Sequence, residues 1–467
     1  MMNMLMFSGS HHAVLRYCLL LMIILSAGCS SIGKIENVPV ASLPQDAQRY
    51  NASNYTRTHP VGDTLMLLAF SGGGTRAAAL SYGVLEELRD TKYQVGGVQV
   101  RLLDEVDRIS SVSGGSFTSA YYGLFGDGIF EDFKEVFLYE DVQGALSSQV
   151  LGLFDMLKRL FSTDSRTEIA VRYYDKHIFR GKTFADLRDS GGPFILINAS
   201  DLNARSQFVF IQSQFDFLCS DISRFKVARA VAASSAVPIL FDPILVKRHD
   251  DCDFKKPNWL DKAQQRADNK NDRRLRELVE SLNFYLDKNN PPYATLVDGG
   301  VTDNLGLRAI LNNVSLSGKV KRFYRNVYGS KPPTRVVVIV VDASTTAVTE
   351  IGKSQELPSI ADTLTAVTDI QLHLYNTETN VLLKEKLLEW TQMLSTPEQP
   401  ITPYFIHLDV SKIKDDEERV YFNKIPTSFS LQKEQADKLI ETARRLLQQN
   451  PVYQKLLHHL GAETLVQ

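Results

Sequence analysis

The stretch Asp107–Gly123, DRISSVSGGSFTSAYYG, constrains the fold of this 467-residue chain more than any other. Its beginning overlaps Val106–Ser110, a run typical of a buried strand, and its end can wind as a helix. Ser113 stands on the tight turn between them, where small neighbours let the backbone turn sharply. A serine on a strand-to-helix turn has the geometry of a nucleophile elbow. The usual Gly-x-Ser-x-Gly pattern here reads Ser111-x-Ser113-x-Gly115, which keeps a small residue in first place.

A second strand–turn–helix unit precedes this one. Thr64–Phe70 is a continuous apolar run suited to a buried parallel strand, and Ala77–Leu88 has a helical pattern. The turn between them is Ser71-Gly-Gly-Gly-Thr-Arg76. It contains no Gly-Lys-Ser/Thr, so it is not a P-loop.

Two interpretations of the glycine turn remain. Gly72, Gly74 and Ala77 fit the dinucleotide pattern Gly-x-Gly-x-x-Ala. Such a site needs an acidic residue at the end of the next strand, and that strand ends in the Ser113 turn instead. The other interpretation is an oxyanion hole, because consecutive glycine N–H groups at a helix N-terminus stabilise negative charge. We favour the oxyanion hole, with Gly72, Gly73 and Gly74 as donors and Arg76 supporting the loop or binding an anionic head group.

A nucleophilic serine needs a base. None of the nine histidines lies in a glycine-rich turn at a strand end, and those that follow Asp298 in the chain are His373, His407, His458 and His459. Asp298 itself ends the apolar run Ala294–Val297 and is followed by Gly299 and Gly300. In a parallel sheet the carboxyl ends of the strands share one edge. We therefore expect the glycine turn, the Ser113 turn and the Asp298 turn at that edge.

The rest of the chain indicates the fold class. Apolar runs predict further strands, and helical spacing predicts further helices. The strands are Phe194–Asn198, Gln207–Gln212, Val336–Val341 and Tyr404–Leu408; the helices are Gly144–Phe161, Phe225–Ser234, Leu364–Leu394 and Leu431–Gln449. Because strands alternate with helices, we expect an α/β fold with a mainly parallel central sheet and helices on both faces.

We expect a catalytic core over residues 63–313, with a polar, solvated insertion at about 248–292 that holds a helix around Arg273–Leu286. Residues 314–467 would form a C-terminal α/β extension packed on the core. The helix at Gly144–Phe161 is apolar over a wide arc, which fits a core helix. It also fits a lid or a face that touches lipid.

Charge and composition exclude several functions. The net charge is −2, from 52 Lys and Arg against 54 Asp and Glu, so nucleic acid is not an expected partner. No His, Cys and carboxylate cluster has the spacing of metal ligands, and we expect neither a metal nor a cofactor.

The N-terminus predicts export. Tyr17–Leu25 is a short apolar core followed by Ser-Ala-Gly-Cys29, as in a signal peptide over residues 1–28. This ending resembles the bacterial lipobox, in which the cysteine is diacylated and becomes the new N-terminus. An ordinary signal peptide with a chance cysteine is the alternative. Ser30, where an Asp would signal retention, implies the outer membrane. We expect an envelope protein anchored by Cys29, facing the periplasm, with residues 29–62 as a tether.

Two further cysteines of the mature chain are Cys219 and Cys252. If Cys29 carries lipid, these two can pair in an oxidising compartment. We expect a disulfide between them, with two buried free thiols as the alternative.

The three turns together resemble the patatin-like phospholipase family. The resemblance covers about Met66–Asn313 and extends to Asn198–Asn203 and Ala230–Pro238. It implies a three-layer α/β/α fold and a Ser–Asp dyad without histidine, so that Ser113 would be the nucleophile and Asp298 its base. Ser71 replaces an Asp common in plant patatins, and Ala77 replaces a Gly.

The resemblance implies a membrane-anchored serine hydrolase of phospholipids or similar esters, acting through an acyl-serine. Two alternatives remain. An acyltransferase or thioesterase would use the same dyad, and an envelope lipoprotein could bind lipid without catalysis.

Overall fold

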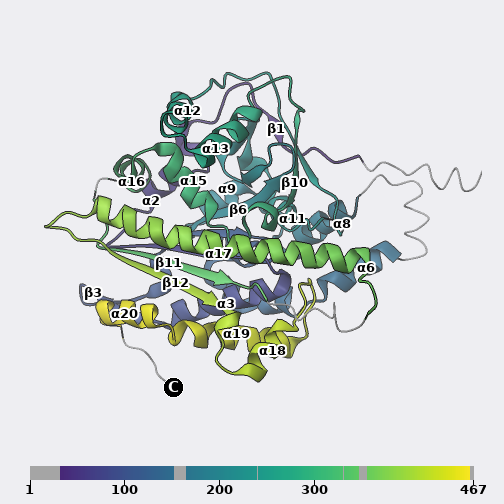
Figure 1. Cartoon of the computed structure of the whole chain (residues 1–467), viewed down its shortest axis with the longest axis vertical. Helices are drawn as coiled ribbons and strands as arrows, with labels where there is room; N and C mark the ends of the chain where they lie inside the picture. Colours follow the sequence, from purple (N-terminus) through teal and green to yellow (C-terminus); the bar gives the residue numbers. More distant parts are fainter. Residues whose placement is uncertain (1–31, 152–164, 239, 330, 346–354, 463–467) are drawn as a thin grey trace, which may run out of the picture.

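A single eight-stranded sheet organises the molecule, a computed structural model that describes residues 32–151, 165–238, 240–329, 331–345 and 355–462 (Figure 1). Seven strands lie in the order β12-β11-β2-β5-β6-β10-β9, and β7 pairs with β6. Their bounds are β2 Thr64–Phe70, β5 Val106–Val112, β6 Phe194–Asp201, β7 Ser206–Val209, β9 Ile244–Lys247, β10 Tyr293–Asp298, β11 Arg335–Asp342 and β12 Thr402–Asp409.

The sheet is parallel in one part and antiparallel in the other. From β12 to β6 every neighbouring pair is parallel. Beyond β6 the direction reverses, because β10 is antiparallel to both β6 and β9, and β7 is antiparallel to β6. Strand β10 is therefore not one of the parallel strands whose carboxyl ends share that edge; the Asp298 turn does lie there, but not for the expected reason.

Helices cover both faces of the sheet, which confirms the expected α/β class. Side chains of β2 alternate between two cores: Met66, Leu68 and Phe70 enter one, and Leu65, Leu67 and Ala69 enter the other. The first core includes α3 (Gly74–Asp90), α4 (Gly114–Phe125) and α19 (Lys433–Gln448), and the second includes α15 (Arg308–Ser317), α16 (Val320–Tyr328) and α17 (Ile360–Leu394).

The remaining elements are short. The helices are α2 (Ala52–Thr58), α5 (Ile129–Phe133), α6 (Val142–Leu151), α8 (Arg166–Tyr173), α9 (Phe184–Asp189), α10 (Gln212–Asp216), α11 (Val227–Ser234), α14 (Gly300–Asp303), α18 (Asp416–Asn423) and α20 (Pro451–Leu460). The strands are β1 (Val38–Pro39), β3 (Lys92–Val95), β4 (Val98–Arg101) and β8 (Ser220–Asp221). Among the described residues, no helix is long and apolar enough to span a bilayer.

Most expected elements are present, with three adjustments. The strand expected at Gln207–Gln212 is β7 and ends at Val209, because Gln212 starts α10. Of the helix expected at Gly144–Phe161, α6 is described, whereas residues 152–164 lie outside the described ranges, together with the signal peptide and Cys29. The C-terminal extension does more than pack on the core, since its strands β11 and β12 complete the sheet beside β2.

The polar insertion is solvent-exposed over much of its surface and contains the helix expected around Arg273–Leu286, but it is also packed on the core. It forms two helices, α12 (Asn258–Lys270) and α13 (Arg273–Phe284), which pack on each other and on α15. Each presents an apolar side to the core: Leu260 and Ala263 from α12, and Leu275 and Val279 from α13, are buried. The high charge of the segment belongs to the outward faces alone.

The segment expected as a tether is also largely docked. The buried Arg229 side chain of α11 binds Glu36 at 2.7 Å and Glu168 at 2.6 Å. Tyr50 is buried and donates to the carbonyl of Ile195 in β6 at 2.8 Å. The chain is therefore held against the body from Glu36 onward.

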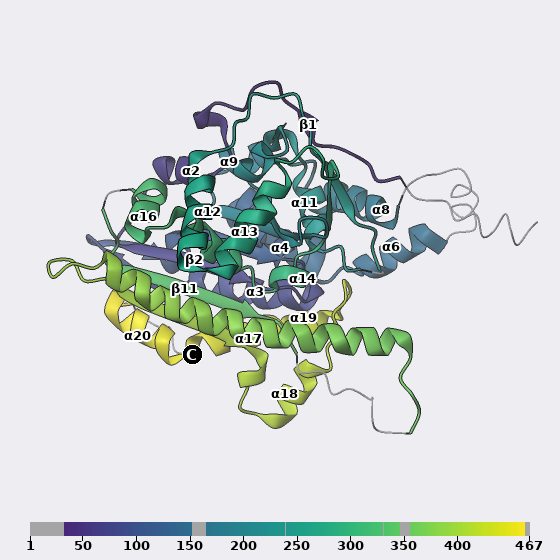
Figure 2. The same cartoon turned by 45° about the horizontal axis from the view of Figure 1, so that its top comes forward.

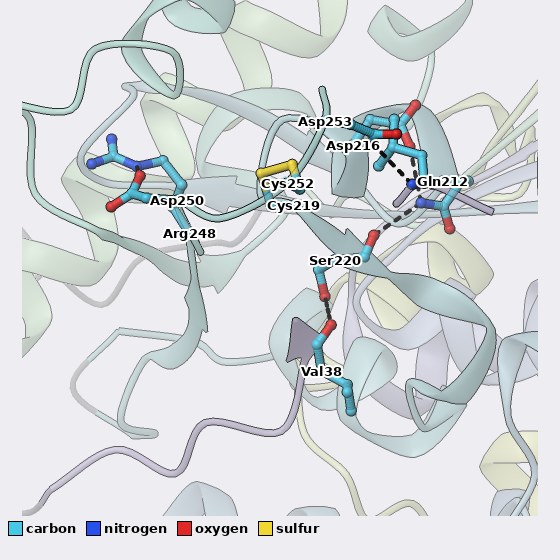
Figure 3. The surroundings of a disulfide bond; sticks show 10 residues. Val38, Gln212, Asp216, Cys219, Ser220, Arg248, Asp250, Cys252 and Asp253 are labelled. Atoms are coloured by element: carbon cyan, nitrogen blue, oxygen red, sulfur yellow. Dashed lines mark hydrogen bonds and ion pairs between the residues drawn. A yellow bond between two sulfur atoms is a disulfide. The ribbon is translucent and has the colours of Figure 1, made fainter. Parts of the chain in front are cut away.

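A disulfide joins Cys219 to Cys252, with the two Cα atoms 5.6 Å apart (Figure 3). Next to it, Ser220 donates to the carbonyl of Val38 at 2.8 Å, and Gln212 donates to the carbonyl of Ser220 at 2.9 Å. The expected pairing is thus present in the structure, and it ties the turn after α10 to the segment that follows β9.

Candidate active site

Ser113 caps the N-terminus of α4 in a strained backbone conformation, with φ 49° and ψ −121°. A non-glycine residue at such angles persists only when its surroundings hold it, and such residues cluster at active sites. Gly114 provides the room: a Cβ atom there would lie 1.9 Å from the carbonyl oxygen of Gly74. The elbow and the glycine loop therefore touch backbone to backbone. A Cβ atom at Gly115 would lie 2.7 Å from the Phe70 Cβ, so this position also requires glycine.

Ser111 occupies the place where the usual elbow has glycine, and its hydroxyl is fully used. It donates to the carbonyl of Leu196 at 3.3 Å and accepts from Ser119 at 2.6 Å and from Ser116 at 3.2 Å. A buried hydroxyl is costly only when it is unpartnered. Serine is thus accommodated because α4 supplies two hydroxyls beneath it.

Two residues that sequence reasoning did not single out fix the elbow from the other side. The Ser113 amide donates to the Ser234 hydroxyl at 2.9 Å, and Ser234 donates to the carbonyl of Asn198 at 2.6 Å. The Asn198 amide group in turn donates to the carbonyl of Ser111 at 2.9 Å. Both lie in the stretches Asn198–Asn203 and Ala230–Pro238, so the resemblance carried a signal for them, although not for their roles.

Register, rather than strand direction, brings Asp298 to Ser113. On β6, Val112 pairs with Asn198 in parallel, and Asp298 pairs with the next residue, Ala199, in antiparallel. Strand β10 thus runs inward from beyond the carboxyl edge and ends level with the elbow. There the Ser113 hydroxyl lies close enough to the Asp298 carboxyl to act on its pKa.

The Asp298 carboxyl is buried, with 8% of the residue exposed, and Ser113 is 4% exposed. Burial raises the pKa of Asp298 to about 6, while hydrogen bonds from the Gly300 amide, at 2.7 Å, and from Ser113 act in the opposite direction. A carboxyl with this pKa is ionised near neutral pH yet accepts a proton more readily than an ordinary aspartate. That is the property a general base needs.

The glycine loop offers two of its three amide groups. The Gly72 amide donates to the carbonyl of Asn304 at 3.0 Å, so it is committed within the protein. Gly73 and Gly74 have positive φ, 137° and 61°, and within the described ranges neither amide has a backbone acceptor. Gly72 still lines the site, since a Cβ there would lie 3.3 Å from that of Ser113. Of the three expected oxyanion-hole donors, the amides of Gly73 and Gly74 therefore remain as candidates.

Arg76 supports the loop from within and, at 3% exposed, cannot reach a head group. Its Nε donates to the carbonyl of Ala343 at 3.0 Å, and its Nη2 to Thr427 Oγ1 at 3.1 Å. Burial lowers the pKa of the guanidinium to about 10, whereas the carboxylates of Asp369 and Asp342 act to raise it.

A loop near the C-terminus braces the same turn. The carbonyl of Ser428 accepts from the Thr75 amide at 2.9 Å, and the neighbouring Phe429 ring packs on Phe117 of α4 at 5.7 Å. The late part of the chain, to which we assigned no chemistry, therefore shapes the glycine loop.

The histidines considered as candidate bases lie away from Ser113. His407, on β12, interacts with Asp342 at 3.3 Å and with Lys412 at 3.0 Å. Three strand spacings, roughly 14 Å, separate β12 from β5. Side chains of His373, His458 and His459 are exposed on helices α17 and α20. Among the described residues, no group of three or more His, Cys, Asp or Glu could hold a metal ion.

A protein-family model matches the family that the three turns resemble. The family model of patatin-like phospholipases matches residues 68–311, just over half of the chain. No significant match was found among curated protein sequences.

Solved structures of human GIVD cytosolic phospholipase A2 are distantly similar. One has a TM-score of 0.45 and 11% identity over 92% of this chain and 66% of that one. Another, in complex with methyl gamma-linolenyl fluorophosphonate, has a TM-score of 0.42 and 11% identity over 92% and 69%. This chain thus spans about two thirds of the human protein.

At these TM-scores the likeness adds nothing to the fold assignment, which stands on the sheet topology and the family model. The chain belongs to the patatin-like phospholipase family and is a lipid acyl hydrolase.

Proposed function

We propose that Ser113 and Asp298 form the catalytic dyad of this hydrolase, with the Gly73 and Gly74 amides as its oxyanion hole. The observation that carries the proposal is the pairing of a strained, buried serine with a buried aspartate whose pKa is about 6. Among the residues that the structure describes, no cationic side chain contributes to the pKa of Asp298, so its carboxylate is free to take the serine proton.

The reaction takes two steps. Ser113 Oγ attacks the ester carbonyl carbon while Asp298 accepts its proton, and the loop amides bind the oxyanion. The intermediate collapses, the C–O bond breaks, and the leaving alcohol takes the proton from Asp298. Water then attacks the acyl-serine with Asp298 as base. The fatty acid leaves, and the proton returns to Ser113 Oγ.

We propose phospholipids or similar acyl esters as substrates, and a position on the periplasmic side of a bacterial outer membrane, held by lipidated Cys29. The disulfide supports an oxidising compartment. Six residues separate Cys29 from the docked Glu36, which makes seven residue steps. Fully extended, they reach about 25 Å, so an acylated Cys29 would keep the body against the bilayer.

Fluorophosphonate labelling tests the nucleophile. The mature chain should be labelled, and Ser113→Ala should abolish the label, whereas Ser411→Ala, on the surface beyond β12, should retain it. Label that survives in Ser113→Ala would refute the assignment.

Mass spectrometry of a lipid-substrate screen tests the reaction type. Release of free fatty acid identifies a hydrolase acting on esters. Acyl transfer to a second lipid, or selective cleavage of thioesters, would identify the acyltransferase or thioesterase that shares this dyad.

A further inference from the structure

Helix α17 has its polarity reversed along its first half. Toward the protein it presents Asn376 and Thr379, both buried, which bond to Ser344 Oγ at 2.8 Å and to Arg308 at 3.1 Å. Toward solvent it presents valine, isoleucine and leucine, alongside exposed polar side chains such as Gln371, His373 and Glu378. A surface helix of a water-soluble protein has the opposite arrangement.

Four apolar residues lie along one side of the helix, with Thr377 and Glu378 between the last two, and we call them the α17 stripe: Val367, Ile370, Leu374 and Val381. Their exposed fractions are 53%, 57%, 58% and 51%. Spacings of three, four and seven residues place them within an arc of about 60° along roughly 20 Å of helix. Single exposed apolar residues are ordinary, but a contiguous row marks an interaction surface.

The helix that carries the stripe lies beside the active site. Asp369, between its first residues, acts electrostatically on Arg76 of the glycine loop. Tyr375 stacks on Arg308, 3.9 Å from the ring centre. Helix α17 also packs on α14, which begins two residues after Asp298.

Other elements near the dyad add apolar surface. Val301 on α14 is 53% exposed, and Leu240, in the loop between α11 and β9, is 59% exposed. That loop begins beside the catalytic aspartate, where the Asp298 amide donates to the carbonyl of Ala236 at 2.9 Å. Apolar side chains from three elements thus surround a site whose family acts on lipid.

Figures 1 and 2 both show the N-terminal end of α17 at the same end of the molecule as the first described residues. A chain anchored through Cys29 would therefore bring this end to the bilayer.

We infer that the α17 stripe inserts into the surface layer of a phospholipid bilayer and holds the Ser113 site against its substrate. The inference rests on the proposed function, because lipid is the occupant that an acyl hydrolase brings to its own active site. An apolar helix face gains free energy when it leaves water for the acyl boundary.

Tryptophan fluorescence tests insertion residue by residue. Ile370→Trp is made in the Ser113→Ala chain, so that vesicle lipid is not consumed, and the signal of the native Trp259 and Trp390 is subtracted. On phosphatidylcholine–phosphatidylglycerol vesicles, the new tryptophan should shift its emission to shorter wavelength and be quenched by brominated acyl chains. Val98→Trp is the matched control, since Val98 on β4 is 65% exposed, and its tryptophan should neither shift its emission nor be quenched.

If the chain sediments with vesicles but the emission of the tryptophan at position 370 does not shift, the inference is overturned. The chain would then bind the membrane through its lipid anchor and not through the stripe. Val367→Ser/Ile370→Ser/Leu374→Ser should lower kcat/KM on vesicles about tenfold or more while leaving a monomeric, water-soluble ester within about twofold. If that variant instead converts a dimer to a monomer without affecting vesicles, the stripe binds a second copy of this chain. Absence of hydrolysis of the soluble ester by the unsubstituted chain would contradict the proposed function, independently of the fluorescence.

Discussion

Two buried aspartates end apolar strands on opposite sides of β5, and their surroundings give them opposite properties. Asp298 ends β10 and meets Ser113; Asp342 ends β11 and meets His407. Burial raises the pKa of both carboxyls. At Asp342, however, His407 and donors from Ser344 outweigh burial, and its pKa falls below the ordinary value. At Asp298 only neutral donors oppose burial, and the pKa stays near 6.

This difference separates a base from a structural carboxylate. A carboxylate paired with a cationic partner binds a proton poorly, whereas one held by neutral donors can still accept it. The carboxylate with a histidine neighbour looks more like part of a catalytic triad, yet it is the less suitable base and lies several strands from the nucleophile.

The largest expected effect is the difference in activity between a substitution of Asp298 and the same substitution of Asp342. Asp298→Asn should lower kcat by about a hundredfold or more, because the amide cannot take the Ser113 proton. Asp342→Asn, the matched control, should stay within about tenfold. Steady-state hydrolysis of a soluble ester measures both losses of kcat. Equal losses would show that Asp298 and Asp342 do not differ as base and structural carboxylate.

The pH profile should show the Asp298 carboxyl directly. Only the ionised form acts as a base, so kcat/KM should rise about tenfold per pH unit below pH 6 and level off above it. His407→Ala should leave this limb in place. If the rise of kcat/KM below pH 6 disappears in His407→Ala, the titrating group is His407 and not Asp298.

Stability should change in opposite directions. The raised pKa of Asp298 means that the folded state loses stability as pH rises from about 4 through 6, so Asp298→Asn should increase the free energy of unfolding at pH 8 by on the order of 1–3 kcal/mol. The lowered pKa of Asp342 contributes stability above the ordinary aspartate pKa, so Asp342→Asn should decrease the free energy of unfolding at pH 8. Urea unfolding at pH 8 and pH 4 measures both; the Asp298→Asn gain should vanish at pH 4.

The smallest effect on activity should come from His407. His407→Ala should leave hydrolysis of a soluble ester within about twofold and cost about 1–3 kcal/mol of stability, because it strips the buried Asp342 of its partner. A large loss of activity without a loss of stability would point to a role for His407 in catalysis.

Sequence reasoning located both aspartate environments only in part. Strand β2 was predicted residue for residue, because its apolar run is continuous and ends in glycines. The pairing of Ser113 with Asp298 was expected from three turns on one edge, but the actual cause is the reversed β10 and its register on β6. Strand direction is set by connections far along the chain, and no local pattern encodes it.

Partners of single amides were equally invisible in the sequence. Gly72 was expected as an oxyanion donor, and nothing in the glycine run shows that the Asn304 carbonyl takes its N–H. Likewise, the insertion was expected to be solvated because its charges are numerous, whereas its buried residues recur at helical spacing that the charges obscured. The tether was misjudged for a related reason, since Glu36 docks on an arginine almost two hundred residues later.

The brace that Ser428 and Thr427 give to the glycine loop has a consequence for biosynthesis. Gly74, Thr75 and Arg76 emerge early from the ribosome, but their partners emerge only near the end of translation. A nascent chain that has already exposed Ser113 therefore lacks a properly held oxyanion hole. The catalytic turns and this support thus come from distant parts of the chain, and a chain truncated before Thr427 would lack the support.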